Sequence, residues 1–232
     1  MEKTTVHSIR VGVTNCYLIG GKGGWVLVDT SGPRAHRRIL KTMQRLGITP
    51  GELKLIILTH GHFDHIGSAA TLRSATGAKI LIHQLDSQML ERGDSNLPKA
   101  FTRWGRCLNA LVPVLDRLTS PTPARADIVL DRETMLLNEY GIDGELLHTP
   151  GHTQGSLSVL LSGGEAFVGD LAFNGSIFCR RPRFVLGQDL DQTKGSWRML
   201  LARGVETVYP AHGRSFPAKC IAELVTAVNS GS

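Results

Sequence analysis

The chain has 232 residues, of which 41% are apolar, and this suits a globular protein with a sizeable core. Its net charge of +6 permits an anionic partner, but moderate basicity is usual on a solvated surface, and we do not expect nucleic acid. No signal peptide is visible, and no apolar run approaches the roughly twenty residues of a membrane span. Four scattered cysteines without a Cys-x-x-Cys pair argue against a disulfide framework or a zinc knuckle. We therefore expect a cytoplasmic protein without a membrane partner.

The first third of the chain predicts strands with one helix among them. Short apolar or alternating stretches lie between glycine-rich turns, which is typical of strands. The predicted strands span residues 4–10, 15–20, 25–29 and 53–58. Pro33 opens the predicted helix, because proline is tolerated in a first turn where its missing N–H has no partner. Gly47 ends this helix.

Four metal-binding side chains follow the strand that ends at Leu58. They are His60, His62, Asp64 and His65, in a chain with only nine histidines. Neutral imidazole and carboxylate are preferred ligands of zinc and similar divalent ions. We expect Gly61 to let the backbone turn tightly, so that alternate side chains point to one place. His60 and His62 can then face one ion, and Asp64 and His65 another.

The middle of the chain predicts helices. Helices are expected over 66–76 and 85–91, on either side of a strand over 79–83. From Ala100 to Leu118 apolar residues recur at three- and four-residue spacing, which predicts a further, amphipathic helix. This last stripe consists of Phe101, Trp104, Leu108, Leu111, Leu115 and Leu118. Because so large a stripe needs a partner, we expect a homodimer with this helix at or near the interface and Trp104 partly lining the substrate entrance.

The last part of the chain repeats the plan of the first. From residue 16 to His60 the chain runs strand, glycine-rich turn, strand, helix, strand. The same order recurs from residue 156 to His212. We interpret this as a duplicated unit whose two sheets pack face to face, with helices outside and the strand ends in one cleft. The remaining predicted strands and helices span 128–130, 134–137, 142–148, 156–161, 166–170, 191–203, 205–209 and 217–228.

Three further candidate ligands lie at strand ends or in tight loops beside glycine. They are His152, Asp170 and His212, and we expect the small neighbours to let a metal approach closely. With the first cluster they make seven candidates. That number is too large for one tetrahedral ion but suffices for two ions that share a bridging carboxylate.

Together these motifs resemble the metallo-β-lactamase superfamily. The matching segments are His60-Gly61-His62-Phe63-Asp64-His65 (H-x-H-x-D-H), Thr149-Pro150-Gly151-His152-Thr153 (the PGHT loop), Gly169-Asp170, Pro210-Ala211-His212-Gly213 and Val28-Asp29-Thr30. The resemblance covers nearly the whole chain and implies an α/β fold, a four-layer αβ/βα sandwich with two mixed sheets face to face and helices outside. It implies a single domain over 1–232, with a helical insertion at about 85–123.

The resemblance also implies a ligand set and a chemistry. His60, His62 and His152 would bind one metal ion, Asp64, His65 and His212 the other, with Asp170 bridging and Asp29 in a supporting role. Zinc is the expected ion, with iron or manganese as alternatives. The implied enzyme is a metallo-hydrolase of an ester, thioester or lactone, in which a hydroxide bridging two ions attacks the carbonyl. Asp64 would be catalytic, orienting that nucleophile.

Other branches of the family fit less well. Class B β-lactamases often carry Cys in place of Asp170, and flavodiiron proteins carry Glu in place of His62. A glyoxalase II-like enzyme adds a helical domain, whereas only twenty residues follow His212. Glyoxalase II-like enzymes and iron persulfide dioxygenases both usually continue Asp-Thr-Leu, where this chain has Leu171-Ala172 after Asp170. These last two activities stay open as alternatives. A non-catalytic metal- or nucleic-acid-binding protein is less expected, since it would not need an open dinuclear site.

Substrate selection has one further signal. Arg180, Arg181 and Arg183 follow the Asp170 loop and could grip an anionic group on a small-molecule substrate. A solvated basic loop is the alternative.

Overall fold

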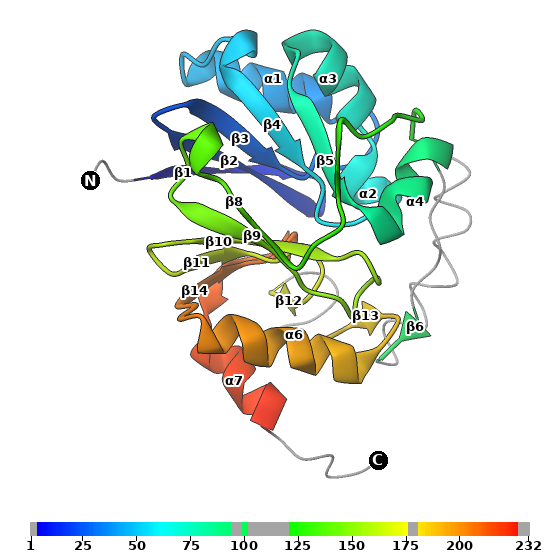
Figure 1. The fold of residues 1–232 in the computed structure, drawn as a ribbon, viewed down its shortest axis with the longest axis vertical. Coiled ribbons are helices and arrows are strands. Elements are labelled where there is room, and N and C mark those ends of the chain that lie inside the picture. Colours follow the sequence, from blue (N-terminus) through cyan, green and yellow to red (C-terminus); the bar gives the residue numbers. More distant parts are fainter. Residues whose placement is uncertain (1–3, 94–98, 102–120, 176–180, 227–232) are drawn as a thin grey trace.

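Two sheets lie face to face between two layers of helices (Figure 1). The structure is a computed structural model, and it describes residues 4–93, 99–101, 121–175 and 181–226. The first sheet has the order β1-β2-β3-β4-β5-β7, with strands β1 (Thr5–Val11), β2 (Thr14–Gly21), β3 (Gly24–Val28), β4 (Leu53–Ile57), β5 (Lys79–His83) and β7 (Ile128–Leu130). The second sheet has the order β16-β14-β11-β10-β9-β8, with strands β8 (Thr134–Leu136), β9 (Gly144–His148), β10 (Leu157–Leu161), β11 (Glu165–Phe167), β14 (Thr207–Tyr209) and β16 (Phe216–Pro217).

Helices cover the outer face of each sheet, and two short strand pairs complete the described part. The helices are α1 (His36–Arg45), α2 (Phe63–Ile66), α3 (Ala69–Thr76), α4 (Ser87–Arg92), α6 (Leu190–Ala202) and α7 (Lys219–Thr226), with 3₁₀ turns η1 (Pro50–Glu52), η2 (Gln84–Asp86) and η3 (Asn138–Tyr140). The short strands pair as β12 (Phe173–Asn174) with β15 (His212–Gly213), and β6 (Lys99–Ala100) with β13 (Leu186–Gly187). Among the described residues, no helix has the length and apolarity needed to cross a membrane.

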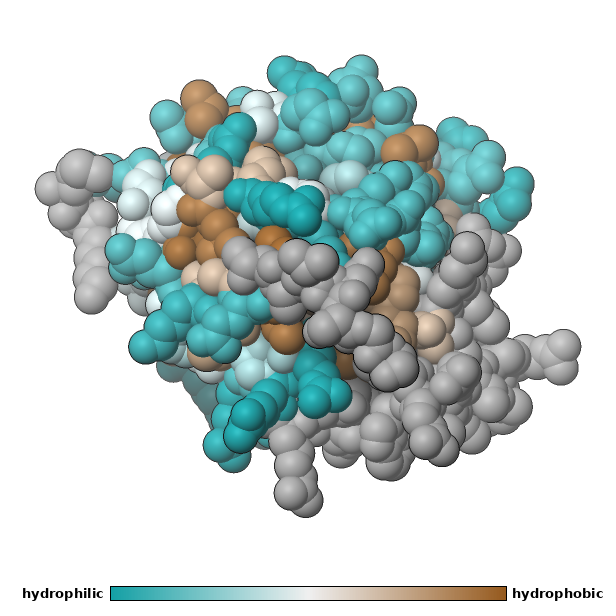
Figure 2. All heavy atoms as spheres, turned by 90° about the horizontal axis from the view of Figure 1, so that it is seen from below, coloured by the Kyte–Doolittle hydropathy of each residue, from teal (hydrophilic) through white to brown (hydrophobic). Residues whose placement is uncertain are grey.

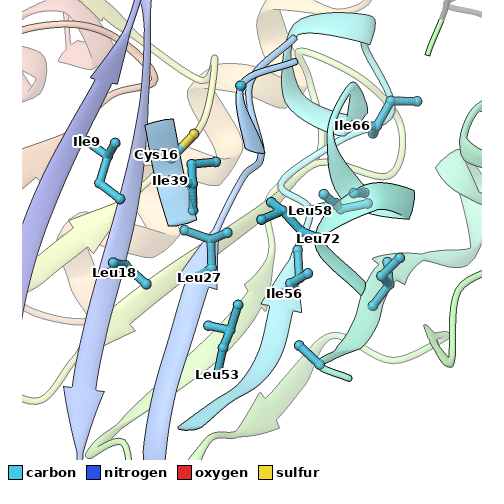
Figure 3. Packing of buried hydrophobic residues seen from close by; sticks show 14 of the residues in the cluster. Ile9, Cys16, Leu18, Leu27, Ile39, Leu53, Ile56, Leu58, Ile66 and Leu72 are labelled. Carbon is cyan, nitrogen blue, oxygen red and sulfur yellow. The ribbon is translucent and has the colours of Figure 1, made fainter. Parts of the chain in front are cut away.

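Three apolar layers hold the sandwich together, because each strand of the sheets sends side chains to both faces. In β3, Leu27 packs in the layer between the first sheet and helices α1 and α3, while Val26 and Val28 pack between the two sheets. Figure 3 shows part of the first of these layers. A third layer lies between the second sheet and helices α6 and α7, around Trp197. Each fully buried Leu or Val contributes about 1.5–3 kcal/mol to folding.

The repeated plan expected from the sequence is present in both sheets. β2 and β3 form an antiparallel hairpin, helix α1 follows, and β4 then pairs parallel to β3. β10 and β11 likewise form an antiparallel hairpin, α6 follows, and β14 pairs parallel to β11. The mixed sheets and outer helices confirm the predicted αβ/βα sandwich.

The helix predicted to open at Pro33 begins three residues later, at His36, and two other predicted helices differ more strongly from the structure. The helix expected over 66–76 is divided into α2 and α3, because Ser68 between them donates to Gly32 O at 2.8 Å and accepts from His36 N–H at 3.1 Å, which turns the chain. Ala100, expected to begin a helix, lies in strand β6 instead. Its strand pairs with β13, and Phe101 N–H continues the pairing by donating to Val185 O at 3.0 Å. The rest of that predicted helix, 102–118, lies outside the described residues.

The outer surface is mixed in character. Figure 2 shows the molecule from below, on the side of α6 and α7, where hydrophilic residues border a smaller apolar area near the middle of the face. The polar groups that matter for chemistry lie elsewhere, at one end of the two sheets.

Candidate metal centre

All seven predicted ligands come together at strand ends. His60 and His62 lie in the loop after β4, and Asp64 and His65 in the short helix α2 that continues it. The other three follow strands of the second sheet: His152 after β9, Asp170 after β11 and His212 after β14. Both sheets therefore contribute side chains to one place, as the sequence predicted.

His60, His62 and His152 form the first group, which we call the three-histidine group. Their ligand atoms lie within 4.8 Å of one another, and all three residues are buried. His152 Nε2 lies 3.0 Å from His62 Nδ1, and the His60 ring lies 4.6 Å, between centroids, from each of the other two rings. Three imidazole nitrogens converging in this way could hold a divalent ion in a tetrahedral site with one open position.

Asp64, His65 and His212 form the second group, which we call the mixed group. His212 Nε2 lies 3.2 Å from Asp64 Oδ2, and the ligand atoms of all three lie within 4.8 Å of one another. Asp170 lies between the two groups. Its Oδ1 is 3.4 Å from His65 Nε2 and 3.3 Å from His212 Nε2, whereas its Oδ2 is 3.7 Å from His152 Nε2. Each oxygen of this carboxylate thus faces a different group, which is the arrangement needed of a bridge.

The outer nitrogens of three of the five histidines are anchored, so that their inner nitrogens face the centre. His65 Nδ1 donates to Asp29 Oδ2 at 2.9 Å, His152 Nδ1 to Leu186 O at 3.0 Å, and His212 Nδ1 to Val13 O at 3.0 Å. Such contacts fix the tautomer and the orientation of a metal-binding ring.

Three inward atoms make no hydrogen bond among the described residues, although two of them, His65 Nε2 and Asp170 Oδ1, face each other as an ion pair 3.4 Å apart. They are His60 Nε2, His65 Nε2 and Asp170 Oδ1, all of them buried. A buried polar atom without a partner costs about 1–3 kcal/mol, so three in one small space need a common partner. A divalent cation satisfies nitrogen and carboxylate lone pairs together, and the donor set therefore fits the metals that the family implies.

The two groups differ in their affinity for protons. Burial, and then the neighbouring histidines, lower the pKa of His60, while burial lowers the pKa of His152 to about 4. Against the effect of burial, Asp170 and Asp64 raise the pKa of His212 to about 10. Burial alone would raise the pKa of Asp64, but His65 and His212 lower it to about 2. The mixed group therefore concentrates carboxylate charge, which attracts protons or a cation.

Asp29 supports the mixed group, as the resemblance implied. Besides accepting from His65, its carboxylate accepts from Thr59 N–H at 2.8 Å and from the Thr59 hydroxyl at 2.8 Å. The Thr59 hydroxyl in turn lies 3.1 Å from His60 Nδ1. Asp29 adopts a left-handed backbone with φ of 61°, a conformation that aspartate tolerates better than most residues other than glycine.

Two glycines beside the ligands are packed closely against other parts of the chain. Gly61 does not take a left-handed turn. A Cβ there would lie 2.6 Å from Met89 Cβ, so the residue is needed for close packing. Gly169 has φ of 53°, and a Cβ there would lie 2.5 Å from Thr59 Oγ1. At both positions protein atoms leave no room for a side chain, so glycine is required by the packing of the ligand loops.

Sequence reasoning missed residues that hold the ligand loops. Asn15 Nδ2 donates to Gly213 O at 2.7 Å and to Pro210 O at 3.2 Å, and the Tyr17 hydroxyl donates to Pro210 O at 2.6 Å. Asp86, buried at the end of the turn after β5, accepts hydrogen bonds from Gly61 N–H and from the Thr153 hydroxyl, each of which lies beside a predicted ligand. Asn15 is the second residue of β2 and Asp86 lies three residues after β5, so the local sequence marks neither of them as a support.

The predicted substrate residues are only partly described. Trp104 and Arg180 lie outside the described residues. Arg181 is exposed, and Arg183 exchanges backbone hydrogen bonds of 3.0 Å with Phe173, whose ring stacks on His212 at 5.2 Å between centroids. The segment that carries these arginines thus lies beside the mixed group.

Comparisons with known proteins agree with this geometry. The sequence pattern of the metallo-β-lactamase superfamily matches residues 9–212. The hydroxyacylglutathione hydrolase GloC of Haemophilus influenzae is 31% identical over 165 residues, which cover 70% of this chain and 68% of GloC.

Two solved structures share the fold. The B3 metallo-β-lactamase BLEG-1 superposes with a TM-score of 0.73 at 23% identity, over 96% of this chain and 100% of BLEG-1. TTHA1623 in a di-iron-bound form has a TM-score of 0.68 at 25% identity, over 92% and 95%. The chain therefore belongs to the metallo-β-lactamase superfamily and is a metallo-hydrolase of that family.

Proposed function

We propose that this enzyme hydrolyses an ester, thioester or lactone and uses two divalent metal ions. The observation that supports this most directly is the placement of Asp170, with one carboxylate oxygen toward the three-histidine group and the other toward the mixed group. When bound, the ions supply a nucleophile by lowering the pKa of water to about 7, and they polarise the substrate carbonyl. His60, His62 and His152 would hold one ion, Asp64, His65 and His212 the other, and Asp170 would touch both.

Asp64 is the candidate catalytic residue. Its side chain is 23% exposed, whereas those of His65, His152, Asp170 and His212 are at most 7% exposed, so it borders the space open to substrate. Because its pKa is lowered to about 2, Asp64 is ionised at neutral pH and is a weak base. Its proposed task is to accept a hydrogen bond from the attacking water and to orient it toward the carbonyl.

The similarity to GloC supports a thioester within this substrate class. A positively charged segment at Arg181 and Arg183, beside the mixed group, supports an anionic group on the substrate. We propose zinc as the native ion, since histidine and carboxylate in a four-coordinate site suit it.

Metal analysis combined with a substrate panel tests the proposal. Purified protein should contain two zinc ions per chain, lose turnover on treatment with a chelator and regain it on zinc addition. The panel comprises S-lactoylglutathione, an acyl-homoserine lactone, p-nitrophenyl acetate and the β-lactam nitrocefin, of which the last should be the poorest. Full activity with one ion per chain would contradict the dinuclear reading.

An iron persulfide dioxygenase is the second candidate. The di-iron form of TTHA1623 supports it, because that related fold accommodates iron. Oxygen uptake with glutathione persulfide by iron-loaded protein, together with no hydrolysis across the panel, would favour this activity over the hydrolase.

We also propose a homodimer held by the apolar stripe between 101 and 118. The support is its sequence pattern alone, since residues 102–118 lie outside the described part. Sedimentation should give a dimer at micromolar concentration, and the double variant Leu108→Glu, Leu111→Glu should be a folded, metal-containing monomer. A wild type that sediments as a monomer would contradict this.

A further inference from the structure

One buried carboxylate joins the two loops that carry the three-histidine group. Asp86 ends the 3₁₀ turn η2 that follows β5, and it is 1% exposed. Its Oδ2 accepts from Gly61 N–H at 3.0 Å and from the Thr153 hydroxyl at 2.7 Å, while its Oδ1 accepts from Gly155 N–H at 3.0 Å. All three donors are protein groups far from Asp86 in the sequence.

These donors sit next to the ligands in the chain. Gly61 lies between His60 and His62, and Thr153 directly follows His152. The first loop belongs to the half of the molecule that contains Asp86, and the second to the other half. The approach of the second loop is close, because a Cβ on Gly155 would lie 2.6 Å from Asp86 Oδ1. The carboxylate therefore sets the distance between the two loops.

The mixed group is anchored by different residues. His65 is held by Asp29, and the loop of His212 is held by Asn15, Tyr17 and Val13 O. Among the described residues, Asp86 makes no hydrogen bond to Asp64, His65 or the His212 loop. Thr59, which donates to Asp29, also lies 3.1 Å from His60 Nδ1 and so links the two groups, whereas Asp86 contacts only the loops of the three-histidine group.

We propose that Asp86 is a positioning residue for the three-histidine group, and that it sets the metal affinity of this group independently of the mixed group. This inference rests on the proposed dinuclear metal site. Partners of this kind change metal affinity by about 10–100-fold when removed. Asp86→Asn keeps the size of the side chain and one acceptor oxygen, but places an amide N–H₂ against groups that are themselves donors.

Two background variants separate the groups. The pair Asp64→Ala, His212→Ala leaves the three-histidine group, and the pair His62→Ala, His152→Ala leaves the mixed group. In each background, zinc affinity is measured by competition with a chromophoric chelator. Asp86→Asn should weaken zinc about 10–100-fold in the first background and leave the dissociation constant unchanged in the second.

Asp127→Asn is the matched control. Asp127 Oδ2 accepts from Ile80 N–H at 2.9 Å near the other end of β5, remote from both groups. This variant should alter zinc affinity in neither background, which separates positioning from general damage to β5. Circular dichroism establishes that each variant is folded.

A second variant covers the case in which Asp86→Asn does not fold. Thr153→Val removes the hydroxyl that donates to Asp86 and also lies 2.8 Å from Ser156 Oγ, and it should weaken zinc in the first background by a smaller factor. Equal weakening in both backgrounds, or none in the first, would overturn the role of Asp86 while leaving the dinuclear site intact. A wild type that takes up no divalent ion would overturn the proposed function and this inference together.

Discussion

At the scale of single residues, Asp170 has two oxygens with unequal surroundings. Oδ1 lies within 3.4 Å of two histidine nitrogens of the mixed group, whereas Oδ2 is 3.7 Å from one nitrogen of the three-histidine group. Asp170→Ala should therefore weaken the ion of the mixed group more, since the other ion retains three imidazoles. Metal analysis should find one ion lost per chain, and turnover should fall by about 100-fold or more because the nucleophile is misplaced.

A surface carboxylate provides the comparison for that variant. Asp143→Ala removes an exposed side chain that accepts from Ser162, remote from the ligands, and it should change neither metal content nor rate. Normal metal content and normal turnover in Asp170→Ala would show that the residue only shapes its loop.

His83 provides a pH-dependent contribution to stability outside the metal centre. Its ring stacks on His148, with centroids 4.0 Å apart and 8° between the planes. Burial, and then His148, lower the pKa of His83 to about 4, although Glu133 and Asp131 oppose this shift. In the unfolded chain the pKa is about 6.5. Between these values the folded state binds fewer protons than the unfolded state, so this contribution is complete above pH 6.5 and is lost as pH falls toward 4.

His83→Asn tests this because an asparagine oxygen can still accept from Leu85 N–H, as His83 Nδ1 does at 3.3 Å. Urea unfolding of zinc-loaded protein should show that the wild type loses more free energy of unfolding than the variant between pH 6.5 and 4.5. Parallel curves for the two proteins would contradict the assignment.

At the scale of elements, the turn after β11 in the second sheet packs against Thr59, which follows β4 in the first sheet. Gly169 takes a left-handed backbone, and a Cβ there would press on Thr59, which holds Asp29 and lies against His60. Gly169→Ala should reduce the free energy of unfolding by about 1–3 kcal/mol. Gly195→Ala in helix α6 has open space and should be neutral or stabilising by up to about 1 kcal/mol. Thermal unfolding compares the two variants, and equal stabilities would contradict the prediction.

Local pattern explains which elements could be predicted from the sequence. The β2–β3 hairpin follows from two apolar runs joined by the glycine-rich turn at 20–24. Helix α6 was predicted over 191–203, and in the structure the Asp189 side chain caps its start by accepting from two backbone N–H groups. The β6–β13 pair joins segments more than eighty residues apart, so no local pattern indicates it. The division of α2 from α3 depends on contacts of Ser68 with a distant loop, and was missed for the same reason.

The residues of the candidate site also fall into those that the local sequence indicates and those that depend on distant contacts. The seven predicted ligands carry distinctive chemistry in distinctive motifs, and the structure brings all of them together. Asp86 and Asn15 carry common side chains whose importance depends on which loops lie beside them after folding. Such supports become visible only when the two halves are placed together in space.

At the scale of the whole molecule, the candidate centre lies across the two halves. Four of its residues, His60 to His65, come from the first half, and His152, Asp170 and His212 come from the second. Bound ions would therefore connect the two sheets as well as satisfy the buried atoms that make no hydrogen bond. We expect metal binding to stabilise the fold as a unit, with a single unfolding transition rather than separate melting of each half.

The size of this effect follows from linkage. An ion present at a hundredfold excess over its dissociation constant adds about 2.7 kcal/mol per site to the free energy of unfolding. In a chain of this length, 1 kcal/mol corresponds to about 2–4 °C, so chelation should lower the melting temperature by roughly 5–10 °C for each ion removed. Added zinc should restore the melting temperature, whereas calcium should not, because calcium prefers oxygen ligands. The double variant His62→Ala, His152→Ala should respond to chelation about half as strongly as the wild type. A wild-type melting temperature that is the same with and without chelator would show that the two halves are held by their apolar layers alone.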